Sequence, residues 1–151
     1  MARVDCHLIH GCGISPDSED VHVKQLSIVQ IQFLRQMLNL HSRSVIALLF
    51  TETGIIPLRV RRLLIVLNHL IYFLGLDKKD YARAALDSSL ELSAKGKTSW
   101  AKDLITAASR LSFRCPVLVL TDMTSIEDVE DYSKTVDRLM KEWFTGVNQL
   151  E

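Results

Sequence analysis

The 151-residue sequence lacks an excess of charge of either sign. Eighteen lysines and arginines balance eighteen aspartates and glutamates. This balance removes the bulk electrostatic argument for a nucleic-acid or membrane-surface protein, but it leaves room for a local basic patch. Cysteine is also scarce: the three cysteines are an odd number, and a chain with 48% hydrophobic residues can bury a core without a disulfide framework. We therefore expect a reduced, intracellular protein of the cytoplasm or nucleus.

The sequence has neither a long apolar run nor an export leader. Its longest apolar stretch, Leu63 to Leu76, spans 14 residues and includes Asn68 and His69, whereas a membrane-crossing helix needs about 20. The first 13 residues carry charged and histidine side chains and no apolar segment of the length that a signal peptide needs. The sequence therefore predicts no membrane association and assigns the apolar stretch to a buried helix.

No assembled active site is evident. Gly11 and Gly13 lack the flanking strand and the further glycines of a dinucleotide-binding loop. No local signature surrounds Cys6, Cys12 or Cys115 that would mark one of them as a catalytic thiol. We therefore expect no enzymatic activity and no cofactor.

One short segment contains the side chains that zinc prefers. Cys6, His7, His10 and Cys12 fall within seven residues and could furnish four donors. Structural zinc sites usually pair their ligands in two knuckles a dozen or more residues apart, whereas this cluster would have to wrap around the ion by itself. We favour a packed or partly exposed glycine turn, and a small zinc module is the less favoured alternative.

Helical spacing of apolar residues dominates the rest of the chain. It predicts an all-α fold, an irregular bundle of five or six helices with a long C-terminal amphipathic helix. The expected helices cover 23–40, a short segment through 46–50, 58–74 as the central helix, 81–95, a segment from the cap at Thr98 or Ser99 to Leu111, and a final helix that begins near Thr124.

The ends of these helices carry recognisable signals. Gly54 and Gly96 are expected to end helices, and Pro57 to open one, because proline at a first helical position loses no needed hydrogen bond. Thr124 with Glu127 three residues later is a capping-box pattern. The stretch from Cys115 to Leu120 is expected to be an extended connector.

The apolar periodicity also assigns faces. In the first long helix the apolar residues expected on the inner face are Leu26, Val29, Phe33, Leu34, Met37 and Leu38. Those expected on the opposite side are Gln25, Gln32, Arg35, Gln36 and Asn39. In the helix 81–95 the residues expected to point inward are Tyr81, Ala82, Ala85, Leu86 and Leu90. Those expected outside, at a spacing of four that favours ion pairs, are Arg83, Asp87, Glu91 and Lys95.

The start of the central helix is unusually basic. Arg59, Arg61 and Arg62 place three positive charges where the helix dipole is already positive. They need compensation, either by acidic neighbours such as Glu52 or by an anion such as a phosphate. Arginines paired with carboxylates on a solvated helix end are the more ordinary interpretation.

At this point the sequence resembles a known family. The string from Leu26 to Leu40 and the arginine-rich segment after it are similar to the region just after the polymerase core in non-LTR retrotransposon reverse transcriptases, in the version seen in fungal elements. The resemblance covers about residues 6–112. The matching residues are Leu26, Val29, Gln30, Phe33, Leu34, Arg35, Leu38, Leu40, Ser42, Ser44, Glu52, Gly54, Pro57, Leu58, Arg59, Arg61 and Arg62, with Leu8 to Cys12 before them and Tyr81, Gly96, Ser99, Trp100, Asp103 and Leu104 after them.

The resemblance implies a helical thumb region that helps to hold a template and primer through backbone contacts. It does not imply activity, because the family's paired metal-binding aspartates have no counterpart here and two-metal phosphoryl transfer requires them. We expect residues 1–112 to form the thumb-like domain and 113–151 to form a connector and a helix packed on it, with 113–123 as the hinge.

Two functions from different classes follow. The first is a non-catalytic fragment with weak affinity for the RNA or DNA backbone, and the residues expected to carry it are Arg35, Arg43, Arg59, Arg61 and Arg62. The alternative is a helical module that binds another protein or associates with itself through exposed apolar helix faces.

Overall fold

The computed structural model describes residues 2–111, 118 and 122–148. Within these ranges the chain forms seven α-helices and one short 3-10 turn, and no strand, which confirms the predicted all-α fold. The bounds are α1 Ala2–Ile9, α2 Asp20–Met37, α3 Ile46–Thr53, α4 Leu58–Gly75, α5 Tyr81–Ala94, α6 Trp100–Ser109, the turn η1 Asp122–Thr124, and α7 Ile126–Asn148. The helix that the apolar spacing did not predict is α1, whose eight residues are too few to establish a period.

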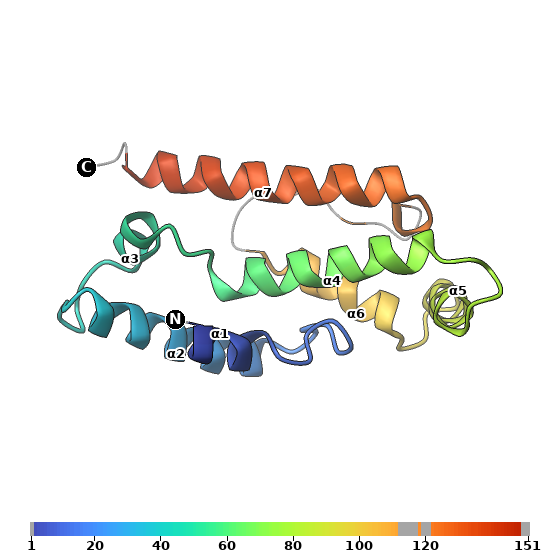
Figure 1. Ribbon diagram of the computed structural model, residues 1–151, viewed down its shortest axis with the longest axis horizontal. Coiled ribbons are helices and arrows are strands. Elements are labelled where there is room, and N and C mark those ends of the chain that lie inside the picture. Colours follow the sequence, from blue (N-terminus) through green and yellow to red (C-terminus); the bar gives the residue numbers. More distant parts are fainter. Residues whose placement is uncertain (1, 112–117, 119–121, 149–151) are drawn as a thin grey trace.

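The other helices are arranged around α4 (Figure 1). It contacts α1, α2, α5, α6 and α7. In the view of Figure 1, α7 runs antiparallel along one side of α4, α1 and α2 lie along the other side, and α5 crosses the far end. A helix that is apolar nearly all round must be covered on most of its sides, so its central place follows from its sequence.

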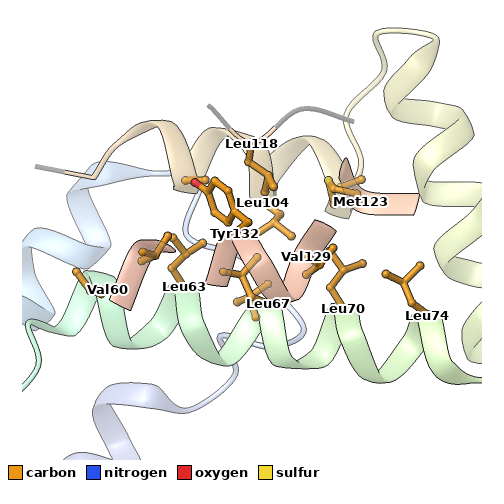
Figure 2. Close-up of a cluster of buried hydrophobic side chains, with 14 of the residues drawn as sticks. Val60, Leu63, Leu67, Leu70, Leu74, Leu104, Leu118, Met123, Val129 and Tyr132 are labelled. Carbon is orange, nitrogen blue, oxygen red and sulfur yellow. The ribbon is translucent and has the colours of Figure 1, made fainter. Parts of the chain in front are cut away.

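The main core lies between α4, α6 and α7. Figure 2 shows Leu63, Leu67 and Leu70 of α4 directed toward Leu104 of α6, with Met123, Val129 and Tyr132 on the same side. Leu67, Leu70, Leu104 and Val129 are completely buried. Leu118 is 1% exposed and belongs to the same cluster. Since α7 contributes to the core that α4 builds, the C-terminal helix packs directly on α4.

Several helix boundaries follow the predicted signals. Gly54 ends α3 in the left-handed conformation, with φ 64°, and Pro57 stands directly before α4. Gly96 takes φ 74° after α5, where its amide and that of Lys97 close the last turn onto Ser93 and Leu92. Of the two candidate caps for α6, Ser99 is the one that caps it: its hydroxyl accepts from the Lys102 amide.

Two boundaries differ from the prediction. The first long helix ends at Met37 instead of residue 40, because Asn39 takes a left-handed φ of 53° and the Leu40 amide turns back to the Arg35 carbonyl. The last helix begins at Ile126, with the Val129 amide bonded to the Ser125 carbonyl, so Thr124 lies in η1 and not at the cap.

Two of the predicted faces are confirmed only in part: Leu34 of α2 and Leu86 of α5 are buried as predicted, but other residues of the same faces are exposed. Val29 and Met37 are 46% and 49% exposed, whereas Gln30 is buried. In α5, Tyr81 is 95% exposed and only the strip around Leu86 is buried, because α5 crosses one end of the bundle and does not lie along it. The predicted ion pairs of α5 are confirmed, since Arg83 contacts Asp87 and Lys95 contacts Glu91.

Most of the proposed hinge, 113–123, and of the connector from Cys115 to Leu120 lies outside the described residues. Across the ranges given above, no helix is both long and apolar enough to cross a membrane.

Candidate functional site: the arginine-rich start of α4

The first turns of α4 bring together a cluster that we call the arginine lock, defined as Arg59 and Arg62 of α4 with Asp17 and Asp20. The backbone amides at the start of a helix carry a partial positive charge. Two guanidinium groups beside them raise that charge further. The cluster is therefore stable only if negative groups come from elsewhere in the chain.

Asp17 compensates Arg62 from the loop before α2. The Arg62 Nε donates to one Asp17 carboxylate oxygen at 2.6 Å and Nη2 donates to the other at 2.9 Å, a bidentate pair. The Nη1 of Arg62 donates to the carbonyl oxygen of Leu8 at the end of α1. The two side chains are 8% and 16% exposed. One buried guanidinium thus ties α1, the following loop and α4 together.

Asp20 compensates Arg59 from the first turn of α2. The Arg59 Nη2 donates to an Asp20 carboxylate oxygen at 2.5 Å, and Lys24 lies 3.3 Å from the other oxygen. The hydrogen bond from Arg59 lowers the pKa of the Asp20 carboxyl below its ordinary value. Asp20 also stands at the N-terminus of its own helix, where a negative charge is favourable.

A buried glutamine completes the attachment of α2 to α4. Gln30 is 5% exposed. Its Nε2 donates to the Ile56 carbonyl at 3.0 Å, and its Oε1 accepts from the Leu58 amide at 2.9 Å. The Leu58 amide is one of the donors that a helix start leaves without an internal partner. Gln30 therefore caps α4 from a neighbouring helix, which explains why a polar residue occupies the buried face of α2.

The cavity enclosed by Arg59, Arg62 and Asp17 has no room for an anion. The cavity that Asp17, Arg59 and Arg62 line has a volume of about 10 Å³, which is at most enough for one water molecule. Two carboxylates already occupy the positions that a phosphate would take. The expected carboxylate compensation is present, but it comes from Asp17 and Asp20, not from Glu52.

The other predicted nucleic-acid contacts lie elsewhere. Arg35 is near the far end of α2 from Asp20, about 22 Å along the axis at 1.5 Å per residue. Its Nε and Nη2 donate to the hydroxyl and carbonyl oxygens of Ser44, at 3.3 and 3.1 Å. Arg43 is exposed in the same connection, and Arg61 is half-buried on α4. The five arginines therefore do not form one surface.

The N-terminal cysteine and histidine segment is divided by burial. Cys12 is 1% exposed, whereas Cys6, His7 and His10 are exposed. Among the residues whose positions are described, no three histidine, cysteine or acidic side chains gather as metal ligands would. Burial raises the pKa of the Cys12 thiol, which keeps it in the unreactive protonated form.

Sequence reasoning missed Asp17, Asp20 and Gln30. Three arginines that oppose a helix dipole indicated that partners must exist, but not which carboxylates would supply them. Asp17 and Arg62 are 45 residues apart in the chain, so only the packing of the N-terminal segment against α4 pairs them.

Comparisons with protein-family models, with curated proteins and with solved structures found no match for this chain.

The buried pair of the arginine lock gives a stability prediction. Arg62→Ala should lower the free energy of unfolding by about 3 kcal/mol, because it leaves the Asp17 carboxylate and the Leu8 carbonyl without their partner. The matched control is Arg138→Ala, which breaks an exposed pair with Glu142 on α7 and should cost less than about 0.5 kcal/mol. Urea unfolding followed by circular dichroism measures both, and similar losses for the two variants would contradict the assignment.

The Asp20 pair gives a pH prediction. Because Arg59 lowers the pKa of Asp20 in the folded chain, the unfolded chain takes up the proton at a higher pH than the folded chain does. The stabilisation by this pair is therefore complete above about pH 4, the ordinary range of the group, and is lost as the pH falls through the lower, folded value. Unfolding curves between about pH 3 and 7 should show a steeper acid loss for the wild type than for Asp20→Asn. If the stability of the wild type and of Asp20→Asn depended on pH in the same way, the assigned pair between Arg59 and Asp20 would be refuted.

Proposed function

We propose that this chain is a non-catalytic helical module that associates with a second copy of itself through the outer face of α2. This face is defined by Val21, Gln25, Ile28, Val29 and Gln32. The observation that carries the proposal is the uneven distribution of exposed apolar side chains. Of the twelve large hydrophobic side chains exposed among the described residues, seven lie between residues 21 and 46. Val21, Ile28 and Val29 belong to this face, and the others are Met37, Leu40, Val45 and Ile46 at the end of α2 and the start of α3.

The outer face of α2 has the composition of an interface centre. Val21 and Ile28 are 62% and 54% exposed and lie opposite the buried Val23, Gln30 and Leu34. The other residues of this face are Gln25, Val29 and Gln32, so the face itself carries no charge. Depletion of charge with apolar residues at the surface is typical of the centre of a protein interface and unusual for solvated helix faces.

The chemistry of the face favours a copy of the same chain as its partner. In a two-fold symmetric dimer the same patch meets itself, so a patch of one charge sign would repel its copy. An uncharged face has no such penalty. Glutamine side chains also carry both a donor and an acceptor, so they can bond to the same residue type across a two-fold axis.

The resemblance to the reverse-transcriptase thumb region supports an uncovered face. In such enzymes a segment of this kind packs beside the palm, and the sequence here contains no palm aspartates. A helix face with exposed apolar side chains gains free energy when another surface covers it.

Self-association is tested by sizing with light scattering between about 1 and 100 µM. The wild type should shift from monomer to dimer with concentration. Ile28→Glu should weaken the dimer at least about tenfold, since it places a charge in the centre of the interface. Tyr81→Glu is the matched control: it also replaces an exposed large side chain, 95% exposed on α5, and should leave the dimer unchanged. A wild type that stays monomeric at the highest concentration would overturn the proposal.

A second candidate function is weak binding to a nucleic-acid backbone. The observation in its favour is that no acidic residue occurs between Val21 and Thr51, whereas Lys24, Arg35 and Arg43 do. Arg43 is exposed and its guanidinium has no partner among the described residues, so it is free to meet a phosphate. Arg59 and Arg62 do not contribute in the same way, because they are paired with Asp20 and Asp17.

Labelled RNA duplex, titrated in low and moderate salt, tests this candidate. Arg43→Ala should weaken binding several-fold and reduce the salt dependence by about one phosphate contact. Arg138→Ala removes the same charge from α7 and should have little effect. Equal affinities for these two variants, or no binding at low salt, would exclude the nucleic-acid function.

A further inference from the structure

We propose that an apolar pocket at the end of the bundle is a binding site for a compact, neutral aromatic molecule. The pocket is lined by residues of α4, α5 and α6 and by the loop that follows α1. Figure 1 shows α5 at the end of the bundle, beside α6 and the end of α4. The pocket is separate from the arginine lock and from the outer face of α2. Its lining residues are Gly13, Ile14, Phe73, Ala82, Ala85, Leu86, Ser89 and Trp100.

The size of the pocket sets the size of the ligand. Its volume is about 290 Å³. A dry cavity of about 150 Å³ accommodates benzene, and pockets for drug-sized ligands begin near 300 Å³. The pocket is therefore matched to a molecule of one or two rings.

The walls favour an aromatic shape. Phe73 and Trp100 meet edge to face, with ring centroids 6.1 Å apart and planes at 70°. Ala82 and Ala85, three residues apart on α5, also line the pocket, and their small side chains take up little of its volume. Aromatic ligands gain from offset and edge contacts with such rings beyond the burial of their area.

The polar groups of the pocket allow few alternatives. None of the described residues that line it is charged, so an ionised ligand would lose its hydration without compensation. The Trp100 Nε1 is already used, since it donates to the Gly13 carbonyl at 3.2 Å. Ser89 accepts from the Ala101 amide at 3.0 Å, and its hydroxyl proton has no acceptor among the described residues. The ligand is thus neutral, with one acceptor within reach of Ser89.

The aromatic wall is held in place without a ligand. The His69 imidazole stacks on Phe73 and lies against Gly13, where an added Cβ would approach the ring to 2.3 Å. Glycine at this position lets the loop approach α4 closely, and the Trp100 hydrogen bond fixes the same loop to α6. By contrast, Ile14 at the rim is 86% exposed. A bound ring gives this side chain a surface to cover, which adds to the favourable burial.

The test uses 2-naphthol as the probe and 2-naphthoate as its charged counterpart. Binding is followed through the indole N–H resonance of Trp100 in NMR spectra, assigned with Trp143→Phe. We expect saturable binding of 2-naphthol with a Kd below about 1 mM, and binding of 2-naphthoate at least about ten times weaker. Absence of a Trp100 shift with 2-naphthol at about 1 mM would overturn the proposal, as would equal affinity for the two probes.

Matched variants locate the site. Ala85→Leu fills the pocket from α5 and should weaken 2-naphthol binding at least about tenfold. Ala84→Leu makes the same change at a neighbouring exposed position that does not line the pocket, and it should bind as the wild type does. Thermal unfolding of both variants checks that they fold, and Ala82→Leu replaces Ala85→Leu if the latter does not. Equal binding by the pocket-filling variant and Ala84→Leu would place the ligand elsewhere and refute the site.

Discussion

The structure depends on how the positive start of α4 is neutralised. The dipole of α4 and two arginine side chains place positive charge in a partly buried position, where the free energy of an unpaired charge is high. Asp17 and Asp20 supply the negative charge, and they belong to the segment that runs from the loop after α1 into the first turn of α2. Electrostatic compensation therefore fixes where that segment lies, and Gln30 then holds α2 against the same end of α4.

The same pairing with Asp17 and Asp20 neutralises the positive charge of Arg59 and Arg62. A guanidinium that makes two bonds to a carboxylate and one to a carbonyl has few donors left for a phosphate. What remains for recognition is apolar or weakly basic: the outer face of α2, the exposed Arg43 and the aromatic pocket beside α5. These surfaces and this cavity lie apart from Arg59 and Arg62 of α4.

Much of the fold could be predicted because it follows from sequence patterns that act within one helical turn. Glycines in left-handed positions and the Ser99 cap act within one helical turn, so their effects do not depend on the rest of the chain. The faces of α2 and α5 were harder to predict. Periodicity identifies the apolar side of a helix. The exposed Val29 and the buried Gln30 show that the packing of neighbouring helices decides which side is buried. The three arginines indicated that a charged site exists at the start of α4. They did not indicate that Asp17, Asp20 and Gln30 would be its other members.

The sequence by itself determined the helical class, most helix ends and the central place of α4, because these follow from spacing, caps and apolar content over a few residues. Only the tertiary structure decided which aspartates meet which arginines, why a glutamine is buried, and where Phe73 and Trp100 enclose a cavity. Those pairings join residues tens of positions apart. The physical reason is that any partner of suitable geometry can stabilise a buried charge or amide. The packing of the helices determines which partner lies within hydrogen-bond distance.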